Sequence, residues 1–498
     1  MDRIDGRHAY LVGIGGCGMS GLARVLRARG GVVSGSDSVA SDVTRALARE
    51  GIEVGLEQTG DALPDDADMV IASAAIKPGH PQLLEAERRG LTVMTYAEAL
   101  GASMGRHTGV ALAGTHGKST TTAMLGAALV DAGLDPSVIV GAQCAQLANG
   151  ALRVPGTPIG YRVGADRIAK GRLAGRPGLM LAEACEFNRS FHDLRPTVAS
   201  ISCVEADHLD VYGSLDAVVE AFRGFAQLVP PAEEGGVLLI GYSGGHRREI
   251  TAGLRCEVQT IGFNPGADWQ VTYDPRSGHV RLEHERCGSI EWTMRLPGAH
   301  NAMNAATAGA LAIILGADAR VVGESLGAFS GLERRTQCLG ERRVPGGAVR
   351  VYDDYGHHPT EIDATLTALR EFERPHEHGG RLICVFQPHQ HSRTRFLLEE
   401  FASAFSTADV VIVPHIYFVR DSEAERHKVS AADLVDRLRA RGVQAMHLYP
   451  FEAIVEQLEN VCRGGDLLVV MGAGPVWQVA HSYLKAPVRE ALDVKAAG

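Results

Sequence analysis

The segment Gly114-Thr115-His116-Gly117-Lys118-Ser119 has the residue types of a phosphate-binding loop. An apolar strand is predicted before it at Thr108–Ala113, and Thr120 leads into a predicted helix. Glycines let backbone amides approach a phosphate, a lysine neutralises its charge, and a serine hydroxyl binds Mg²⁺. The full G-x-x-x-x-G-K-[ST] pattern lacks its first glycine, because Leu112 occupies that position. The loop and its context predict ATP binding, and the alternative is a structural turn without ligand.

Acidic and imidazole side chains follow two predicted strands, 179–182 and 198–203. Open α/β sheets bind their ligands at the carboxyl ends of strands. Mg²⁺ prefers oxygen ligands and keeps several waters. One carboxylate and one imidazole, together with Ser119 and phosphate oxygens, therefore predict a pair of magnesium sites. The alternative is a set of solvated loop charges. The residues concerned are Glu183, Glu186, Glu205, Asp207, His208 and Asp210.

A glycine-rich turn, Gly13-Ile14-Gly15-Gly16-Cys17-Gly18, lies between a predicted strand and a predicted helix. Asp37 ends the next predicted strand, which completes the pattern of a dinucleotide-binding turn. The helix N-terminus of such a turn binds a diphosphate. A nucleotide diphosphate of some kind, UDP-sugars included, is therefore predicted; NAD is a narrower interpretation, and a tight turn without ligand is the alternative.

Two polar segments follow strands in the last third of the chain, Asp353–Thr360 and Gln387–Arg395. Arg393 and Arg395 could clamp a carboxylate or a phosphate, because guanidinium binds both in a bidentate fork. A surface turn closed by a helix N-cap would explain the first segment without a ligand, and a solvated face would explain the second.

These segments need a scaffold, and 498 residues suffice for about three domains. Short β-rich runs alternate with helical patterns throughout, which predicts an α/β fold with parallel sheets. We place boundaries near 106 and 330, giving domains at 1–106, 107–329 and 330–498. A Gly/Arg-rich surface stretch at 148–178 has no predicted role.

Composition excludes several classes of function. The formal net charge of −10 argues against general nucleic-acid binding, which normally requires a basic face. Nine cysteines without C-x-x-C spacing argue against a disulfide framework or a zinc site. No run approaches the roughly 20 apolar residues of a membrane helix, so we expect no membrane insertion and a cytoplasmic protein.

Taken together, the ordered motifs resemble the Mur ligases, and most closely the alanine-adding branch of that family. The resemblance covers nearly the whole chain. It rests on Gly13–Gly21, Ser34–Asp37, Ser73–Lys77, 114–119, Glu183–Phe191, Glu205–His208, Leu296–Asn301, Arg334-Arg335, Asp353–Glu361 and Phe386–Arg395.

The resemblance implies a Rossmann-like N-terminal domain for UDP-MurNAc, a central P-loop-type ATPase domain with a parallel sheet, and a C-terminal Rossmann-like α/β domain that closes over the substrates. It implies that ATP phosphorylates the lactyl carboxylate of UDP-MurNAc and that L-alanine then displaces phosphate. Lys118 and Mg²⁺ would neutralise the two anions brought together, and closure would exclude water from the acyl phosphate.

The resemblance also assigns residues to roles. It implies catalytic roles for Lys118, Glu183, His208, His357 and Arg393, with Ser119, Glu183 and His208 on the metal. Asn301 would contact adenine, Asp354 the ribose, and Arg334 or Arg335 a phosphate. Tyr355, His357 and Arg393 would form the alanine pocket. The UDP-sugar site would comprise Gly15, Gly16, Gly18, Met19, Ser20, Ser36, Asp37 and Ser73.

Some positions depart from the family pattern. Gln390 stands where some relatives carry an arginine, which puts alanine affinity in doubt. No lysine occurs between Lys170 and Lys428, so the carbamoylated lysine of sibling ligases is absent.

Three other functions stay open from the sequence: a recycling ligase that attaches a tripeptide to UDP-MurNAc, an NAD-dependent oxidoreductase, and an inactive binding protein on the ligase scaffold. The sequence leaves the choice between monomer and homodimer, and between L-alanine, glycine and L-serine, undecided.

Overall fold

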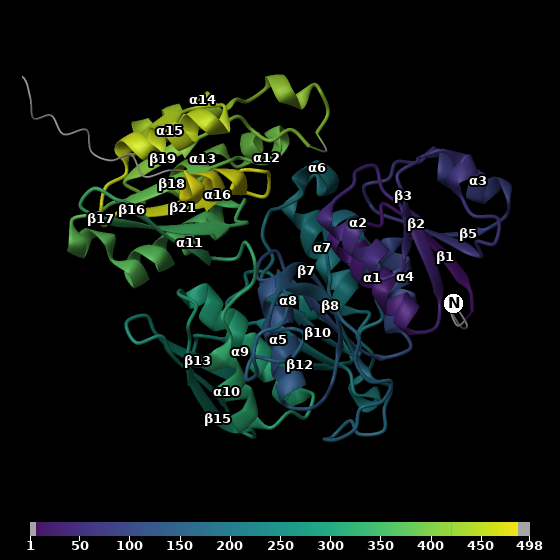
Figure 1. Ribbon diagram of the computed structural model, residues 1–498. Helices are drawn as coiled ribbons and strands as arrows, with labels where there is room; N and C mark the ends of the chain where they lie inside the picture. The colour runs from purple at the N-terminus through teal and green to yellow at the C-terminus, as the bar shows by residue number, and fades with distance from the viewer. Residues whose placement is uncertain (1–5, 420, 487–498) are drawn as a thin grey trace, which may run out of the picture.

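Three separate β-sheets divide the chain into successive α/β units in the computed structural model, which describes residues 6–419 and 421–486 (Figure 1). The predicted α/β class is confirmed. The chain leaves the first sheet before Thr108 and the second before Gln337. The domain boundaries near 106 and 330 remain predictions.

The N-terminal unit has a wholly parallel sheet. Its elements are β1 (His8–Val12), α1 (Cys17–Ala28), β2 (Val32–Ser36), α2 (Asp42–Arg49), β3 (Glu53–Gly55), β4 (Met69–Ala72), α3 (Pro81–Arg88), β5 (Thr92–Thr95) and α4 (Tyr96–Met104). The strand order is β3-β2-β1-β4-β5, so the glycine-rich turn after β1 leaves the centre of the sheet. Reciprocal capping boxes begin α2 at Ser41 and α4 at Thr95.

The central unit is built on one ten-stranded sheet, in the order β15-β14-β13-β12-β11-β10-β6-β9-β7-β8. Neighbouring strands from β12 to β7 are parallel, whereas β13–β15 and the β7–β8 pair are antiparallel. The strands are β6 (Thr108–Ala113), β7 (Ser137–Cys144), β8 (Ile159–Arg162), β9 (Leu179–Glu183), β10 (Val198–Ile201), β11 (Val237–Gly241), β12 (Glu257–Gly262), β13 (Trp269–Asp274), β14 (His279–His284) and β15 (Gly288–Thr293). The helices are α5 (Lys118–Asp131), α6 (Leu209–Tyr212), α7 (Leu215–Ala226), α8 (Arg247–Thr251), α9 (Ala299–Ile314) and α10 (Ala319–Ala328).

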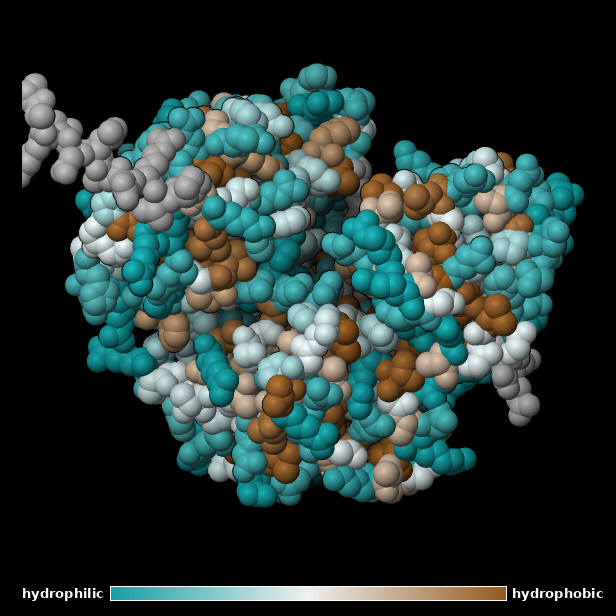
Figure 2. Space-filling view, in the orientation of Figure 1, coloured by the Kyte–Doolittle hydropathy of each residue, from teal (hydrophilic) through white to brown (hydrophobic). Residues whose placement is uncertain are grey.

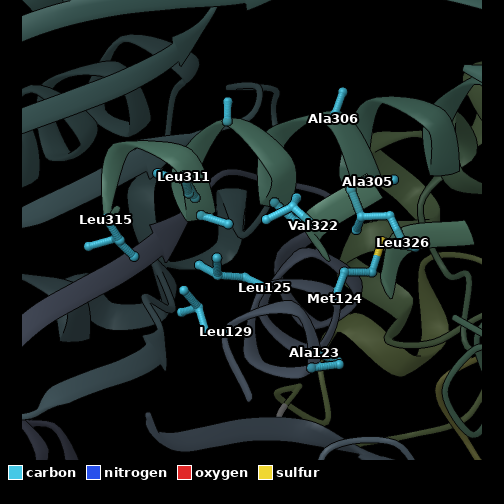
Figure 3. Packing of buried hydrophobic residues seen from close by; sticks show 14 of the residues in the cluster. Ala123, Met124, Leu125, Leu129, Ala305, Ala306, Leu311, Leu315, Val322 and Leu326 are labelled. Carbon is cyan, nitrogen blue, oxygen red and sulfur yellow. The ribbon is translucent and has the colours of Figure 1, made fainter. Parts of the chain in front are cut away.

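Helix α5, which follows the phosphate loop, is buried over almost its whole length. Figure 3 shows why: Met124 and Leu125 lie against Leu311 of α9 and Val322 and Leu326 of α10. From Ala123 to Val130 the helix has no polar side chain, as expected of a helix inside a core. Each buried leucine-sized side chain contributes about 1.5–3 kcal/mol. The first turn of α5 is therefore rigidly held beneath the loop.

The C-terminal unit has a six-stranded sheet in the order β16-β17-β21-β18-β19-β20, parallel except for the β16–β17 pair. The strands are β16 (Gln337–Val344), β17 (Gly347–Asp354), β18 (Leu382–Phe386), β19 (Val410–Val413), β20 (Gln444–His447) and β21 (Leu467–Met471). The helices are α11 (Pro359–Glu373), α12 (His391–Phe396), α13 (Leu398–Ser403), α14 (Ala431–Ala440), α15 (Phe451–Val461) and α16 (Trp477–Lys485).

The stretch 148–178, to which the sequence assigned no role, fastens the N-terminal unit to the central one. Its strand β8 extends the central sheet, and α1 packs against both β7 and β8. The Arg24 guanidinium lies 4.6 Å from the centre of the Tyr161 ring, and Arg29 forms an ion pair with Asp166. The insertion therefore fixes the helix that carries the glycine-rich turn.

The N- and C-terminal units both rise from the central unit and face each other across a hollow in the surface (Figure 2). Helix α12 of the C-terminal unit contacts α6 of the central unit, and the region where these two units meet is called the seam below. Within residues 6–419 and 421–486, no helix is long and apolar enough to cross a membrane.

Candidate active site

The phosphate loop is held in a conformation that requires its two glycines. Gly114 has φ +131° and Gly117 has φ +83°, both in the left-handed region. A Cβ atom at Gly114 would lie 1.9 Å from the Ser202 Oγ, and one at Gly117 would lie 2.3 Å from the Asn304 Oδ1. The Ser202 hydroxyl also donates to the His116 carbonyl at 2.6 Å. The loop is thus fixed from β10 and α9 before any nucleotide binds.

Lys118, the cation of this loop, is bound to protein groups. Its Nζ donates to the Gly114 carbonyl at 2.6 Å and to the Thr115 carbonyl at 3.1 Å, and lies 2.9 Å from the Glu186 carboxylate. Burial disfavours the charged amine, but the Glu186 carboxylate outweighs burial and raises the pKa of Lys118. A phosphate must therefore compete with Glu186 for this ammonium group.

Glu186 also belongs to a second group of side chains. Glu186, Asp207 and His208 offer ligand atoms within 4.8 Å of one another. Burial lowers the pKa of His208, which leaves its imidazole neutral near pH 7 and able to bind a cation. Glu183 instead accepts a hydrogen bond from the Gly141 N–H at 3.0 Å. The structure thus places Glu186 beside His208, while a joint metal role of Glu183 and His208 remains a prediction.

The predicted alanine-pocket residues of the C-terminal unit gather around His389. The rings of Tyr355 and His357 lie 5.5 Å apart, and those of His357 and His389 lie 5.8 Å apart. The Nη1 atom of Arg393 lies 3.2 Å from the His389 Nδ1. Burial lowers the pKa of His357 to about 4, so its imidazole is neutral near pH 7.

Arg393 also joins this unit to the central one. Its Nη2 lies 2.9 Å and its Nε 3.0 Å from one carboxylate oxygen of Asp207, and both side chains are buried. Burial alone would raise the pKa of Asp207, but the Arg393 guanidinium outweighs it and holds that pKa below its usual range. The same arginine therefore lies in the predicted amino-acid pocket and spans the seam.

The two adjacent arginines have different partners. Arg334 lies 3.2 Å from the Asp353 carboxylate and donates to the Gly472 carbonyl at 2.5 Å. Arg335 points across the seam, where its Nη2 lies 3.5 Å from the Ser119 Oγ. This geometry favours Arg335 as the predicted phosphate contact.

Asp354 and Asn301, predicted nucleotide contacts, each bind backbone. The two Asp354 carboxylate oxygens accept from the N–H groups of Thr336 and Gly356, both at 2.6 Å. The Asn301 amide donates to the Pro297 carbonyl at 2.8 Å. Both side chains therefore fix local chain geometry here, and their contacts to ribose and adenine remain predictions.

The predicted UDP-sugar residues surround the turn after β1. The Gly15 N–H donates to the Asp37 carboxylate at 2.9 Å, and the buried Ser36 hydroxyl donates to the Gln82 side chain at 2.7 Å. A Cβ atom at Gly18 would lie 2.6 Å from the Tyr96 hydroxyl. Gly16 belongs to the turn, and Ser73 packs beside it. Met19 and Ser20 are buried on α1. Their sugar contacts remain predictions.

Comparison with known proteins decides the family. The sequence profile of the "Mur ligase family, catalytic domain" matches residues 8–108, that of the "Mur ligase middle domain" matches 112–312, and that of the "Mur ligase, glutamate ligase domain" matches 334–474. The UDP-N-acetylmuramate–L-alanine ligase of Agathobacter rectalis is 38% identical over 484 residues, which are 96% of this chain and 98% of that protein. The chain belongs to the Mur ligase family.

Other relatives agree with this membership. The UDP-N-acetylmuramate–L-alanine ligase of Clostridium novyi is 35% identical, covering 97% of this chain and 98% of that protein. The solved UDP-N-acetylmuramate–alanine ligase of Thermotoga maritima has a TM-score of 0.73 at 24% identity, covering 96% and 98% of the two chains. A murein peptide ligase of Psychrobacter arcticus has a TM-score of 0.69 at 22% identity, covering 96% and 98%. These two structures share the fold of this Mur ligase.

Gln390 of this Mur ligase is the position that the sequence marked as a departure from the family pattern. Gln390 is 3% exposed, has φ +69°, and its N–H donates to the Tyr417 carbonyl at 3.1 Å. The neighbouring Arg395 lies 3.0 Å from the Glu425 carboxylate, and Arg393 is paired with Asp207. Both nearby guanidinium groups therefore already have a carboxylate partner.

The sequence singled out Glu186 and Asp207 as candidate site residues of this Mur ligase, but it did not indicate that they pair with Lys118 and Arg393. Other residues of the site were missed, among them His389, which nothing local distinguished from its neighbours. Glu361 was detectable, because it stands three residues after the helix N-cap His358 and completes a capping box. Tyr96 gave no signal, because its contact with the glycine-rich turn joins distant parts of the chain.

Proposed function

We propose that this Mur ligase uses ATP to join L-alanine to the lactyl carboxylate of UDP-N-acetylmuramate, giving UDP-MurNAc-L-Ala, ADP and phosphate. The observation that carries the proposal is the meeting of two predicted sites at one seam. Arg335 of the C-terminal unit reaches Ser119 of the phosphate loop, and Arg393 of the predicted amino-acid pocket pairs with Asp207. The substrates are those named for the relatives at 35–38% identity.

The reaction has two steps. A carboxylate oxygen of UDP-MurNAc attacks the γ-phosphorus of ATP, and the bond to the β,γ-bridging oxygen breaks to release ADP. The amine of L-alanine then attacks the carbonyl carbon of the acyl phosphate and releases phosphate. Lys118 and Arg335 neutralise charge in the first step, where two anions approach each other. The imidazole of His357 is neutral near pH 7 and can accept a hydrogen bond from the alanine amine, which must be deprotonated before it attacks.

The donor set of the central unit suits Mg²⁺. Ser119 offers a hydroxyl, and Glu186, Asp207 and His208 offer ligand atoms within 4.8 Å of one another. These are mostly oxygen donors beside the phosphate loop, as Mg²⁺ requires. Glu183, at the end of β9, is the further predicted ligand. Mg²⁺ bound there would reduce the negative charge on the phosphates. ATP and a UDP-sugar as substrates place the reaction in the cytoplasm.

Phosphate release tests the proposal. Purified protein with ATP, Mg²⁺ and UDP-MurNAc should release phosphate on addition of L-alanine, and glycine and L-serine show how strictly the methyl group is recognised. A tripeptide serves as the rival acceptor. Turnover with the tripeptide and none with any single amino acid would refute the proposal in favour of a recycling ligase.

The variant Lys118→Ala separates ATP chemistry from sugar binding. It should lose ADP release, because alanine removes the ammonium group that would neutralise the phosphates. UDP-MurNAc binding, measured by calorimetry, should persist, since the glycine-rich turn belongs to a different unit. Retained ADP release would show that the loop at 114–119 is not the site of ATP turnover.

A further inference from the structure

Three side chains that the proposed reaction does not use converge on the seam between the central and C-terminal units. They are His116 of the phosphate loop, Glu205 after β10, and His358 at the N-terminus of α11. Their ligand atoms all lie within 4.8 Å of one another. The His116 Nε2 is 3.5 Å and the His358 Nδ1 is 3.9 Å from the same Glu205 oxygen.

In each imidazole, the ring nitrogen that does not face Glu205 contacts an oxygen atom, and this contact orients the ring. The His116 Nδ1 lies 3.1 Å from the Glu361 carboxylate, and the His358 Nε2 lies 3.4 Å from the Ala206 carbonyl. The His116 Nε2 is then left buried without a hydrogen-bond partner and directed at Glu205. A histidine whose second nitrogen is held by a carboxylate or a carbonyl is the usual arrangement around a protein-bound transition metal.

We propose that His116, Glu205 and His358 bind a divalent cation of the zinc class, at a site separate from the magnesium site. Two imidazoles and one carboxylate favour such a cation over Mg²⁺, which prefers an all-oxygen shell. Bonds of about 2.0–2.1 Å in a tetrahedron place ligand atoms about 3.4 Å apart. The observed 3.5 and 3.9 Å separations from Glu205 are close to this value, and the two imidazole nitrogens lie within 4.8 Å of each other.

Burial lowers the pKa of His116, but Glu205 and Glu361 outweigh burial and raise that pKa well above its usual range, so the cation must displace a proton from this imidazole. It must also displace one existing contact. The His358 Nδ1 accepts the Thr360 N–H at 3.3 Å as the N-cap of α11. This bond is long, and Thr360 is also tied to Glu205 through its hydroxyl at 2.6 Å.

The position of the site gives it a consequence for turnover. His116 and Glu205 belong to the central unit, and His358 belongs to the C-terminal unit, so one cation would tie the two together. Release of ADP and product requires the seam to open. A cation bound at this site would therefore hold the two units together and slow turnover. Removing the cation with a chelator would restore the rate.

Cobalt binding tests the site without relying on turnover. Metal-free full-length protein, without nucleotide, is titrated with Co²⁺ and then with Zn²⁺. We expect one equivalent of Co²⁺ with the intense visible absorption of tetrahedral coordination, displaced by Zn²⁺. His358→Asn should abolish that absorption, and Glu361→Gln should weaken binding by about 10- to 100-fold, because it removes the group that orients His116. Unchanged far-ultraviolet circular dichroism verifies that each variant is folded.

The matched control is His208→Asn, which removes one imidazole from the neighbouring group of Glu186 and Asp207. It should leave the cobalt spectrum unchanged. Loss of the spectrum in His208→Asn with retention in His358→Asn would assign the cation to the magnesium site and overturn the proposal. A weak octahedral spectrum, or no binding at all, would overturn it as well.

Discussion

Replacing Glu186 by glutamine should tighten the binding of metal-free ATP. In the structure, Lys118 donates to Glu186 and to two loop carbonyls, so a phosphate must displace a carboxylate to reach the ammonium. Glutamine keeps the size of the side chain and one acceptor oxygen but removes the charge. The contact that holds Lys118 away from a phosphate is thereby weakened.

The expected gain follows from the kind of bond that is lost. Lys118 stays charged and can still donate to the glutamine oxygen, but one of the two charges of the pair is removed; a hydrogen bond weakens by about 1–1.5 kcal/mol when a charged partner becomes neutral. The difference of about 1–1.5 kcal/mol corresponds to about 5- to 12-fold in affinity. The Lys118 and Glu186 side chains are 17% and 4% exposed, so solvent screens this pair little. In the presence of Mg²⁺, Glu186→Gln should instead weaken ATP binding, because Glu186 is one of the candidate cation ligands.

Titration calorimetry with ATP in EDTA and in Mg²⁺ measures both effects. Glu183→Gln is the matched control in EDTA, because Glu183 bonds to the Gly141 N–H. It should bind metal-free ATP as the unmodified protein does. Unchanged or weaker binding of metal-free ATP by Glu186→Gln would refute the view that Glu186 competes with phosphate for Lys118.

Two further predictions concern stability. Gly101→Ala should destabilise the fold by about 1–3 kcal/mol, because its added methyl group would lie 1.9 Å from the Asp193 carbonyl oxygen. Gly245→Ala, with no neighbour within 4 Å, is the control, and equal melting temperatures of the two variants would contradict the reasoning. The His116 imidazole, whose Nε2 lies 3.5 Å from the Glu205 carboxylate, lowers the pKa of Glu205 from 4.5 to about 2. This carboxylate therefore stabilises the fold above about pH 4.5 and loses that contribution as the pH falls towards 2. His116→Gln should move acid unfolding to higher pH, and an unchanged acid midpoint would show that this ion pair contributes nothing.

Much of the local structure could be predicted from the sequence. The strand at Thr108–Ala113 was predicted with the bounds that the structure shows, because a run of buried residues between turn signals needs no distant information. Strand β8 was missed, because it lies in a Gly/Arg-rich stretch, has no alternating pattern and is stabilised by pairing with β7. Strand β16 was missed as well, since it is a polar edge strand that pairs only with β17.

The candidate site, too, could be predicted only in part from the sequence. The motifs placed Lys118, His208 and Arg393 at the ends of strands, and parallel strands bring such ends to one edge. The motifs did not indicate which carboxylate pairs with each positively charged side chain. Glu186, rather than Glu183, pairs with Lys118, although Glu183 ends strand β9 and Glu186 lies only three residues further on.

By itself, the sequence determined the α/β class, the glycines of the phosphate loop, and membership of the Mur ligases, because these depend on residue types and on spacings within one turn or one strand. Only the tertiary structure decided the pairings across the seam, such as His116 with Glu361 at a separation of 245 residues and Arg393 with Asp207 at 186. The physical reason is that such contacts depend on the order of strands in each sheet and on the docking of whole units. Local periodicity and turn chemistry extend over only a few residues.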